Sequence, residues 1–298
     1  MACGRQFSGG REIKVDEIWR LYQQNKQTIQ EISEITKFSV STVKRRLNDV
    51  QVEWHQPVVK GSGTIHMDAT YTGRNTGVMV ALESQSGRLL YMKHIAHERV
   101  SDYLDAVNYI ESNGYEILGI VIDGLKGLFS ALSKYPLQMC QFHMVAIIRR
   151  KLTMNPQLPA GKELLDLAYK LRDMDKKSFT EAFSSWKQRW HSFLAEKSFN
   201  PETGKQFYTH KRLRSAMSSF SFYQGWLFTY EEVEGMQKTN NIEEGAFTDL
   251  KNNLRNHAGM TPEHRIRFVN GFFLAYGKTH NEKWEKTVKS SPDCIMRF

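Results

Sequence analysis

The sequence predicts an α/β fold preceded by a small helical domain, and three observations carry this prediction. Residues 15–47 show only the helical spacing of apolar side chains, whereas residues 64–95 contain three short β-rich runs separated by turns. A continuous apolar run at 117–122 then follows an amphipathic stretch at 101–113, which indicates a buried strand after a helix. With 298 residues, 40% of them hydrophobic, the chain is long enough for two such domains.

The charge and cysteine content narrow the classes of function. A formal net charge of +9 favours a polyanionic partner, nucleic acid first and an anionic membrane surface second. No stretch approaches the roughly 18 consecutive apolar residues of a membrane span, and residues 1–7 lack the apolar core of a signal peptide. Three scattered cysteines do not make a disulfide framework, so we expect a cytoplasmic protein in a reducing compartment.

Residues 1–56 are predicted to form a helix-turn-helix DNA-binding region. Helices are expected at 15–23, from Thr28 as N-cap with Glu31 completing a capping box, and at 42–48 with Ser41 as N-cap. The last helix would hold its apolar side chains inward and carry exposed cations for the major groove or for phosphates. These cations are Lys44, Arg45 and Arg46. The alternative is an ordinary three-helix bundle with a solvated basic face.

Two short segments lie on either side of the three predicted helices. Residues 51–63, with a proline and glycines, are predicted to be a linker. Residues 1–10 contain Cys3-Gly-Arg-Gln-Phe7, which resembles the closing end of a zinc ribbon. Zinc needs about four ligands and the partner cysteines are absent, so no zinc is assigned there.

The segment from residue 63 onward carries the order of an RNase H-like domain. Strands at 64–69, 78–82 and 89–95 are joined by short turns and should pair antiparallel. A helix at 101–113 and a buried strand at 117–122 follow. Three antiparallel strands, a helix and then a buried strand ending in an acid is the opening order of that fold.

Two acids stand out in these strands. Asp68 lies within an apolar strand, where an unpaired carboxylate is costly, and Asp123 ends the buried strand. Ligands gather near strand ends in such sheets, and a hard divalent cation such as Mg²⁺ would remove the repulsion between two carboxylates. For Asp123, a simple turn-forming role before Gly124 is the alternative.

The middle of the chain supplies a histidine and a helical segment. Cys140-x-x-His143 could bind zinc only with two further ligands, so His143 is interpreted as a structural or substrate-orienting residue, with a satisfied core histidine as the alternative. Residues 152–235 show no β signal and are predicted to be an all-α insertion. Aromatic residues recur there at helical spacing, which indicates core packing rather than base stacking.

A third acid opens a helix near the C-terminus. In a helix over this stretch, Glu244, Lys251 and Arg255 share one face, so an acid at the helix start is followed by two cations that suit a nucleic-acid backbone. An amphipathic helix with a glutamate at its favourable end is the alternative.

Together these motifs resemble the Mutator-like insertion-sequence transposases, closest to prokaryotic members with a ribbon or helix-turn-helix reader. The resemblance rests on His66-Met-Asp-Ala-Thr70, Ile122-Asp-Gly124, Cys140-x-x-His143 and Thr239-Asn-Asn-x-x-Glu-Gly245. It implies an RNase H-like fold at 63–298 with the all-α insertion at about 152–235. It also implies a DDE triad of Asp68, Asp123 and Glu244, where Glu244 is chosen over Glu243 because it precedes the glycine.

The resemblance further implies an activity and its requirements. The expected reaction is cleavage at transposon ends followed by strand transfer to target DNA, with two Mg²⁺ (or Mn²⁺) ions about 3.5–4 Å apart. Asp68 would bridge both ions, Asp123 and Glu244 would each complete one, and His143 would orient a phosphate. The expected partners are transposon-end DNA, target DNA and a second copy of the chain, in a prokaryotic cytoplasm at the nucleoid. The alternatives are a domesticated or inactive transposase that acts as a DNA-binding regulator, and an RNase H-like nuclease acting on RNA–DNA hybrids or junctions.

Overall fold

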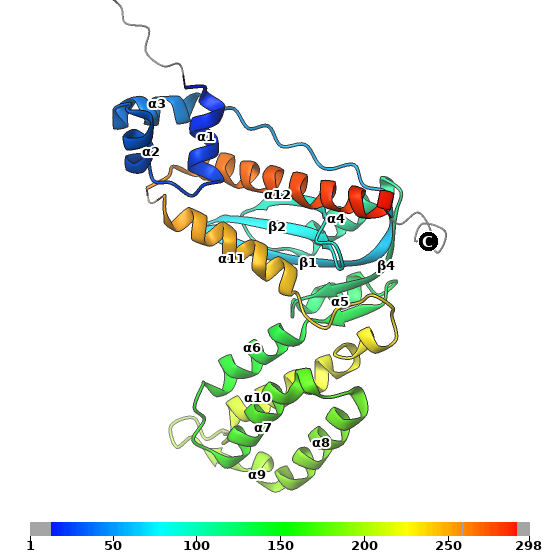
Figure 1. The fold of residues 1–298 in the computed structure, drawn as a ribbon. Helices are drawn as coiled ribbons and strands as arrows, with labels where there is room; N and C mark the ends of the chain where they lie inside the picture. The colour runs from blue at the N-terminus through cyan, green and yellow to red at the C-terminus, as the bar shows by residue number, and fades with distance from the viewer. Residues whose placement is uncertain (1–12, 258, 291–298) are drawn as a thin grey trace, which may run out of the picture.

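A five-stranded sheet lies between a small N-terminal helical unit and a larger helical region. The computed structural model describes residues 13–257 and 259–290 (Figure 1). Cys3 and the ribbon-like segment at 1–10 therefore lie outside the described residues. No helix within the described ranges is long and apolar enough to cross a membrane.

The N-terminal unit contains the three expected helices. They are α1 (Val15–Gln23), α2 (Ile29–Thr36) and α3 (Val40–Asp49). Thr28 caps α2 in the predicted capping box with Glu31. The predicted cap of α3 was wrong: Ser39, whose backbone is extended, accepts the bond from the Thr42 amide, and Ser41 lies inside the first turn.

These helices do not bury their apolar faces only against one another. Ile18, Ile32 and Val43 belong to one hydrophobic cluster with Phe268 and Phe272 of the C-terminal helix. Residues 50–60 form no helix or strand and run from α3 to the sheet, as expected of a linker. The predicted linker extended to residue 63, which was wrong, because the first strand already begins at Gly61. The N-terminal unit is thus tied to the C-terminal end of the chain by packing as well as to the sheet by the linker.

The sheet confirms the predicted order of elements. Strands β1 (Gly61–Gly73), β2 (Thr76–Glu83) and β3 (Leu89–Ile95) pair antiparallel. After α4 (Val100–Ser112), strands β4 (Tyr115–Ile122) and β5 (Leu137–Met139) add in parallel to β1 and β4 respectively, with α5 (Lys126–Ala131) between them. The strand order is β3-β2-β1-β4-β5.

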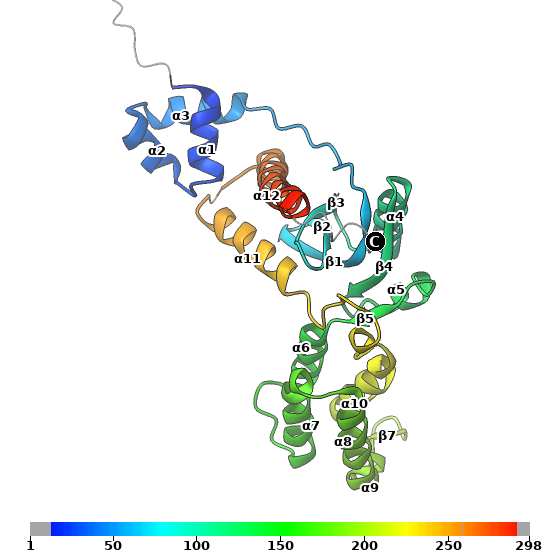
Figure 2. The same ribbon diagram turned by 45° about the vertical axis from the view of Figure 1, so that its right-hand side comes forward.

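The two faces of the sheet are covered by different helices (Figure 2). One face buries Ile65, Met67 and Ile120 together with Tyr103 of α4. The other buries alternating residues of β2, Val80 among them, against α11 (Asn241–Arg255) and α12 (Pro262–Ser290). This alternation decides which strand residues face α11.

The region after β5 is mostly helical. It contains α6 (Gln141–Leu152), α7 (Pro159–Lys170), α8 (Lys176–Arg189), α9 (His191–Ala195) and α10 (Lys211–Tyr223), with short 3-10 turns at Leu171–Asp173, Gln224–Trp226 and Thr229–Glu231. The expected core role of the aromatic stripe is confirmed, since Phe179, Phe183 and Trp186 are buried.

The prediction of an all-α segment was wrong at one place. A hairpin of β6 (Lys197–Phe199) and β7 (Gln206–Tyr208) interrupts the helices. Its strands are only three residues long, too short for a period-two pattern to show, and their side chains are not buried. The turn between them ends at Gly204, whose φ of +64° suits glycine.

Candidate functional site

The direction of the strands gathers the candidate residues at one edge of the sheet. Strands β1, β3, β4 and β5 run the same way, so their carboxyl ends share this edge. Asp123 directly follows β4, and Cys140 follows β5 and precedes α6. In the parallel register His66 lies beside Val121, so two residues further along each chain come Asp68 and Asp123. The structure therefore places the two predicted acids on neighbouring chain segments.

Asp68 is a buried carboxylate with little to neutralise it. It lies opposite Val80 of β2 and therefore on the sheet face covered by α11. Its side chain accepts a hydrogen bond of 2.7 Å from the Ala69 amide. Burial raises the pKa of Asp68 well above its usual range, and the negative charge of Asp123 raises it further, with smaller contributions from Glu98 and Glu244. Such a shift is what a bound cation would reverse.

Asp123 both forms a local turn and borders a cleft. Its carboxylate accepts a hydrogen bond of 3.0 Å from the Leu125 amide, which is the local turn contact expected of an aspartate before glycine. It also borders a cleft of about 750 Å³. The other charged or titratable residues that line this cleft are Glu98, His143, Arg149 and Arg150.

The first turn of α11 brings two glutamates to the same region, with opposite exposure. Glu243 is fully buried, and its Oε2 lies 3.9 Å from Nδ1 of the equally buried His66. Burial raises the pKa of Glu243 well above its usual range, followed by the charge of Asp68. Glu244 is half-buried, and burial raises its pKa as well.

His143 stands between the strand acids and Glu244. Its Nε2 lies 3.9 Å from Oδ2 of Asp68. Burial lowers the pKa of His143, which favours the neutral imidazole, while Asp123 acts in the opposite direction. The structure thus brings His143 together with the predicted acids.

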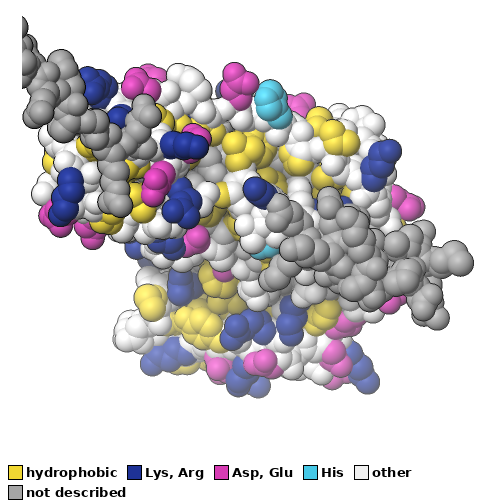
Figure 3. Space-filling model, turned by 45° about the horizontal axis from the view of Figure 1, so that its top comes forward, with side chains coloured by type: hydrophobic (Ala, Val, Ile, Leu, Met, Phe, Trp, Pro, Cys, Tyr) yellow, Lys and Arg dark blue, Asp and Glu magenta, His cyan; other side chains and the backbone are white. Residues whose placement is uncertain are grey.

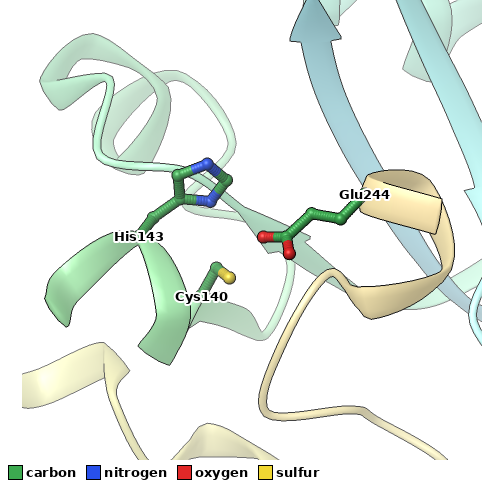
Figure 4. A group of neighbouring side chains, drawn as sticks. All are labelled: Cys140, His143 and Glu244. Carbon is green, nitrogen blue, oxygen red and sulfur yellow. The ribbon is translucent and has the colours of Figure 1, made fainter. Parts of the chain in front are cut away.

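Cys140, His143 and Glu244 form a second grouping that overlaps the acids (Figure 4). One potential ligand atom from each of them lies within 4.8 Å of the other two. Burial raises the pKa of the Cys140 thiol to about 12, so the thiol is neutral near pH 7. The sequence supplied only two of these ligands at short spacing, and the third comes from a distant helix.

Glu98 is a further acid of the site that the sequence analysis missed. It lies in the loop between β3 and α4, lines the cleft with Asp123, and accepts a hydrogen bond from the Tyr103 hydroxyl. Burial, and then Asp123, raises the pKa of Glu98. The signal was available: β3 runs parallel to β1, so the residues after β3 reach the same edge as Asp123.

The predicted DNA-binding cations divide into exposed and engaged residues. Lys44 and Arg45 on α3 are exposed, as are Lys251 and Arg255 on α11. Arg46 was expected outside but is half-buried: it donates to the Ile13 carbonyl and lies over the Phe38 ring at 4.6 Å. Arg46 therefore serves the packing of the N-terminal unit, because its guanidinium reaches back across α3 to the preceding turn.

Several solved structures are similar to the chain. No family model and no curated protein matches the chain. The chain is similar to the Drosophila P element transposase strand transfer complex, with 11% identity over 88% of this chain and 92% of that chain and a TM-score of 0.42. It is also similar to the simian T-cell lymphotropic virus intasome in complex with PP2A regulatory subunit B56 gamma, with 11% identity over 68% of each chain and a TM-score of 0.22. These scores are too low to establish a shared fold, so the functional proposal rests on the geometry of the site.

Proposed function

We propose that the protein is a DNA transposase of an insertion sequence that cleaves transposon ends and transfers the strand to target DNA. The observation that carries the proposal is the meeting of Asp68, Asp123 and Glu244 from β1, the end of β4 and the start of α11. Asp68 is buried with other acids as its main charged neighbours, an arrangement that is costly without a cation. The order of strands, β3-β2-β1-β4-β5, supports an RNase H-like domain at 63–298 with residues 152–235 inserted before the third acid.

The donor set fits Mg²⁺ or Mn²⁺. Asp68, Asp123 and Glu244 offer carboxylate oxygens, the ligands that hard divalent cations prefer. Oε1 of Glu244 is buried and has no hydrogen-bond partner among the described residues, so it is available as a ligand. When bound, two such ions would activate an attacking hydroxyl and stabilise the leaving oxygen of a phosphodiester.

The other cleft residues have distinct roles in this proposal. Arg149 and Arg150 lie on the wall formed by α6 and hold the phosphates on either side of the scissile bond. The neutral His143 donates a hydrogen bond to a phosphate oxygen and so orients it beside Asp68. Glu98 adds a fourth carboxylate to the cleft that Asp123 borders.

The long axis of α11 connects the acids to the N-terminal helices (Figure 1). Glu244 lies in its first turn near α6, and Arg255 in its last turn near α1–α3. Exposed Lys251 and Arg255 would contact backbone phosphates along this path, and Lys44 and Arg45 of α3 would contact the recognised end sequence. Figure 3 shows Lys and Arg side chains over both the N-terminal helices and the helical region. Bringing two transposon ends together would require a dimer of the chain.

The decisive experiment is Mg²⁺-dependent cleavage of DNA that carries the inverted repeats flanking the coding sequence. We expect Asp68→Asn to abolish cleavage and strand transfer but to retain end binding, since the substitution leaves helices α1–α3 unchanged. The matched control is Asp166→Asn, an exposed acid of α7 paired with Lys170 at 2.6 Å, which should cleave as the wild type does. Strand transfer by Asp68→Asn would refute the assignment.

The same assay separates the alternatives. A DNA-binding regulator would bind these ends without cutting them in Mg²⁺ or Mn²⁺. A nuclease of the RNase H type would cut an RNA–DNA hybrid in preference to the transposon end.

A further inference from the structure

We propose that Cys140, His143 and Glu244 form a binding site for one divalent metal ion of borderline softness, such as Zn²⁺. Because Glu244 also belongs to the proposed Mg²⁺ site, the two modes of metal binding exclude each other. Zn²⁺ would therefore switch the protein off by withdrawing Glu244 from the acids of the sheet. The binding site stands on its own geometry, and only its inhibitory consequence rests on the proposed function.

The geometry brings three unlike ligands from separate elements into one space. Cys140 lies between β5 and α6, His143 lies in the first turn of α6, and Glu244 lies in the first turn of α11. Figure 4 shows the imidazole, the thiol and the carboxylate turned toward one another. Their nearest potential ligand atoms lie within 4.8 Å of each other. Zinc bonds of about 2.0–2.3 Å place tetrahedral ligand atoms roughly 3.5 Å apart, so small side-chain rotations would close the site.

Two of the three potential ligand atoms have no hydrogen-bond partner among the described residues, while Sγ of Cys140 accepts a hydrogen bond of 3.4 Å from the Asn240 amide. The two are Nδ1 of His143 and Oε1 of Glu244, and both are buried. Nε2 of His143 lies 3.9 Å from Asp68, so the ring can direct its second nitrogen to a carboxylate. This is the usual arrangement of a zinc-bound histidine, in which a carboxylate fixes the tautomer and orientation of the ring.

The ligand types select the metal. Imidazole and thiolate suit Zn²⁺ and Co²⁺, whereas Mg²⁺ prefers oxygen ligands alone. On binding, the Cys140 S–H bond breaks, its proton leaves to solvent, and a sulfur–metal bond forms with no change of oxidation state. With three protein ligands, the fourth position stays open to water, as in zinc sites that are not purely structural.

Co²⁺ spectroscopy of the metal-stripped full-length protein tests the site directly. We expect one equivalent of Co²⁺ to produce a sulfur-to-cobalt charge-transfer absorption. Cys140→Ser should lose this band, and serine can still begin α6. The matched control replaces the other two cysteines: a Cys3→Ser/Cys294→Ser variant should keep the band. No band in the wild type, a band in Cys140→Ser, or its loss in the control variant would each overturn the proposal.

Inhibition of cleavage tests the consequence. In constant Mg²⁺, Zn²⁺ should inhibit the wild type, and Cys140→Ser should need at least about tenfold more Zn²⁺ for half inhibition, since losses of even outer partners cost 10–100-fold in metal affinity. Equal sensitivity of the two proteins would overturn the switch. If the protein cleaves no DNA at all, the proposed function fails, while the Co²⁺ measurement still decides the metal site.

Discussion

Two glutamate–histidine pairs lie side by side where α11 meets the sheet, and they differ in access to solvent. Glu243 faces His66 with both side chains at most 1% exposed. Glu244 faces His143, whose side chain is 27% exposed and borders the cleft. The residue types are the same and the glutamates are neighbours in the chain, so burial alone separates the sealed pair from the open pair.

The difference teaches how one helical turn can serve packing and chemistry together. Successive residues of a helix point about 100° apart, so the start of α11 directs one carboxylate into the sheet and the next toward α6. The sealed pair is buried between α11 and the sheet, and the open pair presents ligands. Replacing each glutamate separately tests this division between packing and chemistry.

The largest expected effect comes from replacing one glutamate at a time. Glu244→Gln should lower the cleavage rate by about 10³-fold, because metal stabilisation of several kcal/mol is lost at 1.36 kcal/mol per tenfold. Glu243→Gln should stay within about threefold of the wild type, under about 1 kcal/mol. Burial raises the pKa of Glu243, which favours its neutral form, and glutamine has nearly the same shape. Single-turnover cleavage in Mg²⁺ measures both. The reverse ranking would assign the metal to Glu243.

Stability should show the opposite ranking. Glu243→Ala should cost about 2–4 kcal/mol, because it leaves a cavity and removes the polar neighbour of buried His66. Glu244→Ala should cost less than about 1 kcal/mol, as its side chain is only half-buried. Urea unfolding followed by circular dichroism gives both values, and equal losses would erase the distinction between the pairs.

The cleft wall beside the open pair should contribute to DNA binding in a salt-dependent way. Arg149→Ala and Arg150→Ala should each reduce the slope of log affinity against log salt concentration by about one, because each removes one phosphate contact. Arg189→Ala is the control, since Arg189 does not line the cleft and pairs with Glu163 at 2.9 Å. Fluorescence anisotropy at several salt concentrations checks this, and unchanged slopes for both cleft variants would remove the arginines from the interface.

The smallest effect concerns a second sealed imidazole at the opposite end of α11. Nε2 of the buried His257 forms a hydrogen bond of 3.0 Å to the Tyr22 carbonyl, and burial lowers the pKa of His257. The unfolded chain therefore binds a proton at His257 as pH falls through about 6.5, while the folded chain resists it, so stability falls with pH there.

We expect the melting temperature of the wild type to drop more between about pH 7 and pH 5 than that of His257→Gln. His55→Gln, at an 82% exposed side chain, should keep the wild-type slope. Parallel slopes for the wild type and His257→Gln would show that this histidine does not sense pH.

Much of the sheet and its acids could be predicted from local pattern. Short turns between β-rich runs indicated the antiparallel strands, and the apolar setting of Asp68 marked it as unusual. The partners that come from elsewhere could not be found this way. Glu98 lies in an ordinary loop and is indicated only by the direction of β3, not by local pattern. No local pattern near Cys140 indicates Glu244, because their contact depends on how α11 packs against the sheet.

Errors in the prediction also have physical causes. The cap of α3 was misplaced because Ser39 and Ser41 both have capping side chains, and only backbone conformation selects between them. Arg46 was expected outside because a cation at that helical position is usually solvated, but the Phe38 ring draws its guanidinium inward. Burial of the long helix α12 against both the sheet and α1 requires tertiary knowledge that spacing alone does not supply.

Helix α11 also sets a length. Its fifteen residues span roughly 22 Å at 1.5 Å per residue, from the acids to the N-terminal helices. Lys26 ties the second half of α11 to the N-terminal unit: its Nζ pairs with Asp249 at 2.5 Å, and its carbonyl accepts a hydrogen bond from Asn256. Since B-form DNA advances about 3.4 Å per base pair, such a span corresponds to about six or seven base pairs. Under the proposed function, this helix is a ruler that fixes the offset between the sequence recognised and the phosphate cut.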